Sequence, residues 1–483
     1  MTQSFRLNFG GSIDRQRPLN FTFDNKRYSG FGGDTLASAL LANGVRLVGR
    51  SFKYHRPRGI LSAGSEEPNA LVELRTGARQ EPNTRATTIE LFDRLTARSQ
   101  NRWPSLKFDV MAFNSLLSPI FAAGFYYKTF MWPASFWEKV YEPAIRRAAG
   151  LGRAAEAADP DIYEKATGHC DVLVIGAGPA GLMAALAAAR SGARVILCDE
   201  DFQLGGRCLS EDRTIGDRKA AEWAQSVEAE LAASAEVKIL RRTTVFGVYD
   251  GGIYAAFERV NDHVASPPPH EPRQRLWRII AKQAVLAAGA IERPLVFGDN
   301  DRPGVMLAGS VRTYINRFAV KPGSRAVVFA NNDDALQTLE SLNAAGIEIA
   351  ALADPRPAAK ESAEAARRAD TRLIAGAITG VHGGNRVTAV DVRDADGKTT
   401  TLDCDLIAMS GGWNPTLHLT SHLGGHLGDG PVWNEALSAF VPGKLPPGMR
   451  VAGAAAGQFS LSETLPRGAE AGLRAADACG FKG

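Results

Sequence analysis

The sequence predicts an α/β protein, and three observations support this fold class. From about residue 169 onward the hydrophobic pattern alternates between strands and helices, which is typical of a mostly parallel sheet. Within that region, residues 172–200 read VLVIGAGPAGLMAALAAARSGARVILCDE: a strand, a glycine-rich turn, an alanine-rich helix and a second strand. Of the 483 residues, 45% are hydrophobic and 22% are charged, as in ordinary globular proteins. A chain of this length is expected to hold more than one domain.

The composition argues against several classes of protein. The net charge of +4 is small for this length, so we expect neither nucleic acid nor a membrane surface as a partner. Asn114, Pro119 and Gly124 interrupt the apolar run at 110–131, which is too broken for a membrane span of about 20 apolar residues. The N-terminus lacks the apolar core of a secretory signal, and we expect a cytoplasmic protein. The cysteines are scattered without a C-x-x-C pair, which indicates reduced thiols (Cys170, Cys198, Cys208, Cys404 and Cys479).

Residues 1–95 combine short β-like runs (FRLNF, FTFDN, ALVEL and TTIEL) with one helix at TLASALLANGV. This order, with the loop GILSAGSEEPNALV at 59–72, resembles the cluster-binding half of a small [2Fe–2S] ferredoxin domain. Such a loop needs C-x4-C-x2-C, because thiolates hold the irons. Here Ser62, Glu67 and Ala70 stand at those positions. We therefore expect a ferredoxin-like β-grasp domain without Fe–S cysteines.

The basic run FKYHRPR at 52–58 precedes that loop, and two interpretations of it stay open. It could contact the phosphate of a flavin or nucleotide at a domain edge, or it could be a loop that is solvated or paired with carboxylates. The histidines suggest no metal site, because His55, His169 and His382 have no ligand-like neighbours at short spacing.

Residues 96–168 form a connecting segment that is rich in aromatic residues. The stretch 118–145 carries more large rings than an isolated connector needs (Phe125, Tyr126, Tyr127, Phe130, Trp132, Phe136 and Trp137). Aromatic residues are enriched at the cores of protein interfaces, so part of this stretch is expected to contact another surface. The alternative is a lid packed on the core of its own domain.

The motif VLVIGAGPAG predicts a dinucleotide site. Gly176 allows the tight turn after the strand, Gly178 lets the backbone approach a pyrophosphate, and Gly181 lets the helix pack closely on the sheet. The phosphates are expected at the positive end of the helix that begins near Ala180. Asp199 and Glu200 end the second strand, where a carboxylate can accept a hydrogen bond from a ribose 2′-hydroxyl and disfavours NADP. The alternative is an empty Rossmann unit retained for packing.

The rest of this region resembles the two-dinucleotide-binding flavoproteins, of the FAD/NAD type. Residues 284–306 (AVLAAGAIERPLVFGDNDRPGVM) and 405–415 (DLIAMSGGWNP) resemble their crossover strands, and 324–354 form a second β-α-β unit. We expect a first Rossmann domain at 169–322 and 385–483, and a second, degenerate one at 323–384.

The second unit lacks the glycines of a dinucleotide site and has Ala330, Asn332 and Ala335 at those positions. Asp333 and Asp334 stand at the helix start, where we expect them to cap the helix and to repel a pyrophosphate. One dinucleotide site is therefore expected.

The strand RVAGAAAGQFSL near the C-terminus bears on which dinucleotide that site holds. In FAD-binding relatives this strand ends in A-x-G-D, and the Asp holds the ribityl chain; here Ala454 takes that place. A buried ribityl hydroxyl without this partner costs about 1–3 kcal/mol, whereas NAD has no ribityl group. This favours NAD over FAD.

Five stretches of the sequence are distinctive when taken together: GDTLASALLANGVRLVGRSFKYHRPRGILSAGSEEPNALVEL, EPNTRATTIELFDRLTARSQNRWPSL, GFYYKTFMWPASFWEKVYEPAIRRAAGLG, the glycine motif and ERPLVFGDNDRPGVMLAGSVRTYINRF. Through these stretches, and over essentially its whole length, the chain resembles the alpha subunit of heterotetrameric sarcosine oxidase. The resemblance implies a complex with beta, gamma and delta subunits that oxidises sarcosine to glycine, with hydrogen peroxide and a one-carbon unit as co-products. It also implies NAD in this chain, FMN at the interface with the beta subunit and FAD in the beta subunit. By this resemblance the stretch 118–145 contacts other subunits or the FMN.

The resemblance adds five residues to the nucleotide site and no catalytic residue. Beside Gly176, Gly178, Ala180, Gly181, Asp199 and Glu200, it implies Arg207 in the GGRC turn, Val245 on a strand near the adenine, and Ala454, Phe459 and Leu461 on the other side. The family's alpha subunit usually continues into an aminomethyltransferase-like half, so tetrahydrofolate is expected only if such a domain is supplied elsewhere. The isolated chain is not expected to be catalytic.

Three alternatives stay open. The complex could oxidise another secondary amine, such as N-methylglutamate, hydroxyproline or an opine, because the amine site belongs to a partner subunit. The chain could be a stand-alone FAD/NADH reductase, which needs two dinucleotide sites or a redox dithiol. It could also be a scaffold with an empty pocket.

Overall fold

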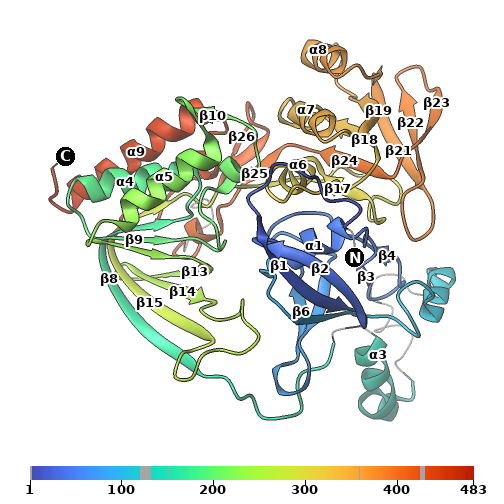
Figure 1. Ribbon diagram of the computed structural model, residues 1–483, viewed down its shortest axis with the longest axis horizontal. Coiled ribbons are helices and arrows are strands. Elements are labelled where there is room, and N and C mark those ends of the chain that lie inside the picture. Colours follow the sequence, from blue (N-terminus) through green and yellow to red (C-terminus); the bar gives the residue numbers. More distant parts are fainter. Residues whose placement is uncertain are drawn as a thin grey trace. The chain divides into compact units, whose positions relative to one another are not determined.

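The computed structural model describes residues 3–119, 124, 132–148, 150, 152–357, 359–424 and 430–482. Within it the chain forms two units, each made of two separate stretches of sequence. Unit 1 comprises Met1–Pro160 and Pro294–Gly411, and unit 2 comprises Asp161–Arg293 and Gly412–Gly483 (Figure 1).

The N-terminal part of unit 1 is a β-grasp domain. Its mixed sheet has the strand order β2-β1-β7-β5-β6, in which β1 pairs in parallel with β7 and antiparallel with β2. The helix α1 (Leu36–Ala42) is buried along its whole length, and the Thr35 hydroxyl caps it by accepting from the Ser38 amide. The remaining elements are β1 (Asp14–Phe23), β2 (Lys26–Gly32), β3 (Gly49–Arg50), β4 (Pro57–Arg58), β5 (Leu71–Leu74), η1 (Gly77–Arg79), β6 (Glu81–Arg85) and β7 (Leu95–Ser99).

A carboxylate occupies the loop in which a ferredoxin domain would bind its cluster. Glu67 is fully buried, and its Oε2 accepts from the amides of Leu61 and Ser62 at 2.9 and 2.7 Å. Its Oε1 accepts from the amides of Asn69 and Ala70 at 2.7 and 3.0 Å. Burial raises the pKa of Glu67, and the four amides act in the opposite direction. The Glu67 carboxylate thus connects the backbone at 61–62 with the backbone at 69–70.

The segment that follows carries η2 (Val110–Leu117), η3 (Ala134–Phe136), a single π turn η4 (Trp137–Tyr141) and α3 (Glu142–Ala148). Of the aromatic stretch at 118–145, the residues Phe125, Tyr126, Tyr127 and Phe130 lie outside the described residues. Trp132 and Phe136 are exposed. The alternative of a lid packed on its own core therefore does not hold for these two rings.

The second part of unit 1 is a Rossmann-like domain built on a parallel sheet. Its strand order is β17-β24-β18-β19-β20, and a three-stranded antiparallel sheet β21-β22-β23 adjoins it. Its elements are β17 (Val305–Leu307), α6 (Ala308–Asn316), β18 (Arg325–Ala330), η6 (Asp334–Leu336), α7 (Gln337–Ala344), β19 (Glu348–Ala353), α8 (Lys360–Arg368), β20 (Leu373–Ile374), β21 (Gly376–His382), β22 (Ala389–Asp394), β23 (Thr399–Asp403) and β24 (Leu406–Ser410).

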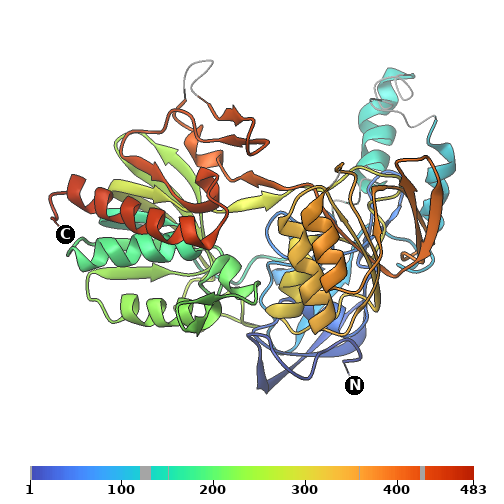
Figure 2. The ribbon, with the colours of Figure 1, turned by 90° about the horizontal axis from the view of Figure 1, so that it is seen from above.

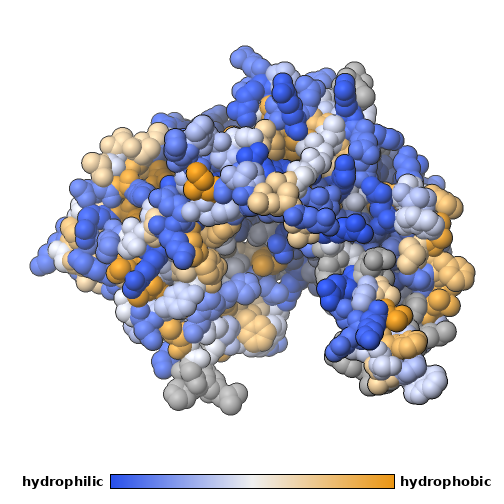
Figure 3. Space-filling model, turned by 90° about the horizontal axis from the view of Figure 1, so that it is seen from below, coloured by the Kyte–Doolittle hydropathy of each residue, from blue (hydrophilic) through white to orange (hydrophobic). Residues whose placement is uncertain are grey.

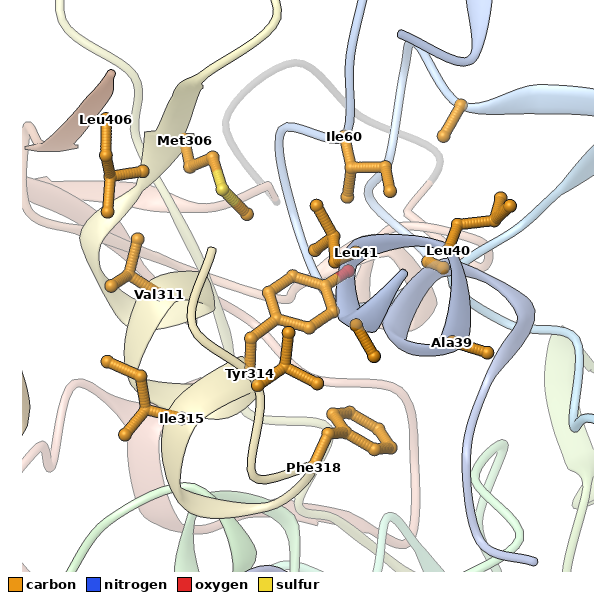
Figure 4. Packing of buried hydrophobic residues seen from close by; sticks show 14 of the residues in the cluster. Ala39, Leu40, Leu41, Ile60, Met306, Val311, Tyr314, Ile315, Phe318 and Leu406 are labelled. Carbon is orange, nitrogen blue, oxygen red and sulfur yellow. The ribbon is translucent and has the colours of Figure 1, made fainter. Parts of the chain in front are cut away.

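These two parts share one hydrophobic core. Tyr314 and Phe318, on and just after α6, pack in the same cluster as Leu40 and Leu41 of α1 (Figure 4). The Tyr314 hydroxyl donates to the carbonyl of Ser62, in the loop that Glu67 closes. The two parts therefore form one folded body.

The boundaries between the two units of the structure differ from the domain boundaries that the sequence predicts. The sequence predicts that residues 294–322 and 385–411 belong to the first Rossmann domain. In the structure they belong to unit 1, together with the second Rossmann domain. The physical reason is the shared core, in which α6 packs against the β-grasp domain. The expected boundary at residue 95 also cuts β7, whose strand Leu95–Ser99 pairs with β1 and β5.

Unit 2 is the first Rossmann domain. Its sheet runs β12-β9-β8-β15-β14-β13, and β28 pairs in parallel with β15. The helices α4, α5 and α9 lie side by side along one face of this sheet (Figure 2). The elements are β8 (Tyr163–Ile175), α4 (Pro179–Arg190), β9 (Val195–Cys198), η5 (Gly206–Leu209), β10 (Thr214–Ile215), β11 (Arg218–Lys219), α5 (Ala220–Ala232), β12 (Val237–Leu240), β13 (Thr243–Tyr249), β14 (Ile253–Glu258), β15 (Gln274–Leu286), β16 (Ala290–Glu292), β25 (Trp413–Pro415), η7 (His418–Thr420), β26 (Val432–Asn434), β27 (Ala439–Val441), β28 (Met449–Val451), η8 (Gly453–Ala456) and α9 (Leu461–Ala478).

Candidate nucleotide-binding site

The glycine motif forms the turn between β8 and α4. Gly176 has φ of 96°, a left-handed conformation that favours glycine, and its amide donates to the carbonyl of Cys198 on β9. A Cβ at Gly181 would overlap the carbonyl oxygen of Gly176, so only glycine lets α4 start this close to the strand. Gly176 thus makes the tight turn, and Gly181 the close packing of helix on strand, that the sequence predicts.

Gly178 differs from the other two glycines because, among the described residues, no atom lies close to the position that its Cβ would take. A Cβ at Gly178 would meet no atom within 4 Å. Gly178 is the N-cap of α4, and no side chain caps the helix there. The first amides of a helix have no partner within the helix, and its N-terminal end favours an anion. The turn therefore fits a pyrophosphate.

Asp199 lies at this turn, directly after β9. Its Oδ2 accepts from the amide of Ala177 at 2.5 Å, and its Oδ1 accepts from the amide of Asp201 at 2.8 Å. Burial, together with the nearby Asp201, raises the pKa of Asp199 to about 7. A ribose hydroxyl that donated to this carboxylate would stabilise its ionised form.

The other acid, Glu200, is exposed, and its carbonyl oxygen accepts from the Arg259 guanidinium at 2.7 Å. The structure thus brings Asp199, rather than Glu200, to the glycine turn. Val245 on β13 is buried in a core cluster with Ile196 and Leu240. Its side chain supports the sheet beside the site.

The GGRC turn adjoins the glycine motif. The Gly205 amide donates to the carbonyl of Ala177 at 2.9 Å, and a Cβ at Gly206 would lie 2.9 Å from the Gly178 Cα. Arg207 follows, with its Nε 2.7 Å from Glu211 Oε1 and its guanidinium 4.7 Å from the centre of the Trp413 ring.

Sequence reasoning missed the roles of Glu211 and Trp413 as neighbours of Arg207. The spacing of Arg207 and Glu211, four residues apart, is a signal that could have indicated the first contact.

The loop at 453–461 closes on the start of α4. Gly453 has φ of 70°, and a Cβ there would lie 2.7 Å from the Cβ of Ala180. Gln458 shapes this loop, since its side chain accepts from the Gly453 amide at 2.9 Å. Ala454 is half-buried within η8 and presents a methyl group to this loop. Gln458 is a further residue that the sequence analysis did not identify.

Phe459 and Leu461 are half-buried, and Leu461 begins α9. The helix approaches α4 closely, because a Cβ at Gly468 or Gly472 would overlap the carbonyl oxygens of Ala180 and Ala184. The structure therefore brings the loop and the glycine motif together in unit 2.

In the second Rossmann-like domain, Asp333 is the N-cap residue of η6, but its side chain makes no capping hydrogen bond. For Asp333 the predicted cap is therefore wrong. Asp334 pairs with Arg312 at 2.7 Å, and Asp333 pairs with Arg356 at 2.7 Å. Each carboxylate has a buried or half-buried guanidinium as a stronger partner. The side-chain oxygen of Asn332 instead accepts from the Ala335 amide at 3.3 Å.

Arg356 also pairs with Asp354, which directly follows β19, at 2.8 Å. Asp354 stands where a dinucleotide fold places its ribose-binding acid, and Arg356 engages it. That this domain holds no dinucleotide stays a prediction.

The basic run at 52–58 pairs with carboxylates. Arg56 contacts Asp299 and Asp301, at 2.5 and 2.6 Å, and Arg58 contacts Asp301. Of the two interpretations, the structure favours the carboxylate-paired loop for these two arginines. His55 is buried, with its Nδ1 2.7 Å from Asp109 Oδ2.

The five cysteines are free thiols. Burial raises the pKa of Cys170, Cys208 and Cys404 to about 12, so these thiols are poor nucleophiles at neutral pH. Among the described residues no group of His, Cys, Asp and Glu could hold a metal ion. No helix among the described residues is long and apolar enough to cross a membrane.

Two family models match parts of the chain. Residues 16–102 match the family described as a 2Fe-2S iron-sulfur cluster binding domain. Residues 171–265 match the family described as FAD dependent oxidoreductase. The crystal structure of L-proline dehydrogenase from P. horikoshii is 19% identical, with a TM-score of 0.64, and covers 98% of this chain and 76% of that chain. These findings confirm the predicted fold class.

Two curated relatives are similar over almost the whole chain. Sarcosine oxidase subunit alpha of Rhizobium meliloti (strain 1021) is 54% identical, over 96% of this chain and 46% of that protein. Sarcosine oxidase subunit alpha of Corynebacterium sp. (strain P-1) is 38% identical, over 97% of this chain and 44% of that protein. The chain thus spans about half the length of the curated relatives that it matches. It belongs to the family of the sarcosine oxidase alpha subunits.

Proposed function

We propose that this chain is the NAD-binding part of the alpha subunit of a heteromeric sarcosine oxidase. In this proposal it holds NAD at the turn after β8 and contributes no catalytic residue. The complex, with its beta, gamma and delta subunits, converts sarcosine to glycine, with hydrogen peroxide and a one-carbon unit as co-products. The flavins supply the redox chemistry, with FAD in the beta subunit and FMN enclosed between this chain and the beta subunit.

The observation that carries the proposal is the start of α4 at the glycine turn, where no side chain caps the helix. The amides at the start of α4 and the open space beside Gly178 fit a pyrophosphate. Asp199 lies at the same turn, where it can accept from a ribose hydroxyl. In the other Rossmann-like domain, Arg356 bridges Asp333 and Asp354. One dinucleotide site fits a binding subunit, whereas a stand-alone FAD/NADH reductase needs two such sites or a redox dithiol.

The choice of NAD over FAD rests on the loop that packs against Ala180. Ala454 presents a methyl group at the position where FAD-binding relatives have an Asp. A ribityl hydroxyl buried there without a partner would cost about 1–3 kcal/mol. NAD does not carry that group. The chain's own residues in this proposal bind and orient the nucleotide: Gly176, Gly178 and Gly181 through the backbone, and Asp199 through its carboxylate.

The experiment is to purify the isolated chain, denature it and identify the released nucleotide by chromatography and absorbance. The proposal predicts a colourless protein that releases NAD and binds it again in calorimetry, without binding NADP or FAD. A yellow protein that releases FAD would support the reductase. A protein that binds neither would support an empty scaffold.

The substrate is tested on the assembled complex. Co-purification of this chain with its co-encoded subunits should give a flavin-containing complex that consumes oxygen with sarcosine. Turnover with N-methylglutamate, hydroxyproline or an opine, and none with sarcosine, would refute the substrate and leave the binding role intact.

A further inference from the structure

Large apolar side chains face outward along one segment of unit 1. Trp103, Phe108, Phe113 and Leu116 are between 61% and 72% exposed, and Val110 is 45% exposed. We call these five residues the apolar face. Figure 3 shows that apolar side chains reach the surface of the molecule on the face that is drawn.

Buried polar groups hold this segment in place. Asp109 is the anchor: its Oδ2 lies 2.7 Å from His55 Nδ1, and both side chains are buried. The other oxygen, Oδ1, accepts from the amides of Trp103 and Met111 at 3.0 and 3.1 Å. The second of these bonds caps η2, which carries Phe113 and Leu116.

Main-chain contacts on either side of Asp109 fix the segment further. The buried Arg50 guanidinium donates twice to the carbonyl of Leu106, at 3.1 and 2.7 Å. Asn385 donates to the carbonyl of Lys107 at 3.1 Å. The Leu106 side chain is part of the hydrophobic core. The segment is thus attached by its backbone, by Asp109 and by Leu106, while the five apolar side chains are directed outward.

The chemistry of the segment is that of an interface core. Among residues 103–117 the charged residues are Lys107 and Asp109, and Asp109 is buried. Interface cores are depleted of charge and enriched in aromatic residues. Three of the five residues of the apolar face are aromatic.

The exposed area suits a stable protein contact. A large aromatic side chain contributes about 150–250 Å², so three rings at these exposures, with Val110 and Leu116, present on the order of 500 Å². A standard interface buries about 800 Å² on each partner, of which about 57%, or roughly 450 Å², is apolar. The apolar face alone supplies that amount.

We infer that the apolar face docks on another subunit of the same oxidase complex, through a charge-poor, apolar surface of that subunit. The inference rests on the proposed function, since it needs a chain that works as a subunit; the relatives carry the name subunit alpha. It places the contact on the 103–117 segment, upstream of the aromatic stretch at 118–145.

The test is a double variant, Phe113→Arg with Leu116→Arg, which changes two exposed side chains. The matched control is Val296→Arg, because Val296 is an apolar residue of the same unit and is 94% exposed. Each chain is co-expressed with its co-encoded subunits, and assembly is measured by light scattering after gel filtration. Hydrogen exchange of residues 103–117 is compared between the isolated chain and the complex.

The double variant should fold and bind NAD as the wild type does, but assemble at least about tenfold more weakly, as for the loss of interface hot spots. The control should assemble normally, and residues 103–117 should gain protection in the wild-type complex. Normal assembly of the double variant, with no protection, would overturn the inference and leave the proposed function standing. Self-association of the isolated chain through this face, or its sedimentation with phosphatidylglycerol vesicles, would identify a different occupant and overturn it. A wild-type chain that is co-expressed with those subunits and purifies without them would refute both the inference and the proposed role as a subunit.

Discussion

Glu67 provides the sharpest test of the β-grasp domain. Its two carboxylate oxygens accept four backbone amides at 2.7–3.0 Å, and the side chain is fully buried. In Glu67→Ala these amides lose their partner inside the protein. Each buried, unsatisfied donor costs about 1–3 kcal/mol, so four of them cost about 4 kcal/mol even at the lower limit.

A loss of about 4 kcal/mol is large against a total stability of about 5–15 kcal/mol. For a body of this size, each kcal/mol lowers the melting temperature by about 2–4 °C, which gives a decrease of about 8–16 °C for unit 1. Glu67→Gln keeps one acceptor oxygen and should lose about half as much. Scanning calorimetry measures both variants, with the half-buried neighbour Glu66→Ala as the control. A Glu67→Ala melting temperature within about 3 °C of the wild type would show that the carboxylate does not hold this loop.

Three further predictions concern the nucleotide site. Gly178→Ala should keep the melting temperature, because its Cβ meets no atom within 4 Å, yet weaken NAD binding at least about tenfold by obstructing the pyrophosphate; unchanged affinity in calorimetry would contradict the placement. Gly181→Ala should lower both stability and NAD affinity, because its Cβ overlaps the Gly176 carbonyl; a variant that melts and binds like the wild type would refute the close approach. The pKa of Asp199 is about 7 in the folded protein, above the unfolded value near 3.9, so the stability contributed by this group falls as pH rises from about 4 to 7. Because NAD should favour the ionised carboxylate, affinity should rise about fivefold to tenfold from pH 6 to pH 8, and a flat profile, or one unchanged by Asp199→Asn, would exclude this role.

Local signals in the sequence predict the glycine turn well. The left-handed conformation of Gly176 and the tight contact of Gly181 follow from residue type and spacing. The helix at 35–45 is likewise present as α1 (Leu36–Ala42), because its apolar spacing and Thr35 cap are local features.

Strand pairing is less predictable. The run FRLNF forms no strand and makes one bridge, Arg6 to Val320, and TTIEL makes one bridge, Thr35 to Glu90. Conversely, β6 has the polar sequence EPNTR and becomes a strand because β5 pairs with it. A β-like run needs a partner strand, and the sequence of the run alone does not identify one.

Long-range packing decides the remaining differences. The packing of Tyr314 against the β-grasp domain moves α6 out of the predicted first Rossmann domain. Asp333 pairs with Arg356, which is distant in sequence, and makes no capping hydrogen bond. The partners of Arg207 and the role of Gln458 also depend on contacts between separate segments.

The most direct test of the account is calorimetry of the isolated chain with NAD and with FAD, together with its visible spectrum. The account predicts a colourless protein that binds one NAD and no FAD, and that does not oxidise NADH. A yellow protein with bound FAD that oxidises NADH without partner subunits would contradict it.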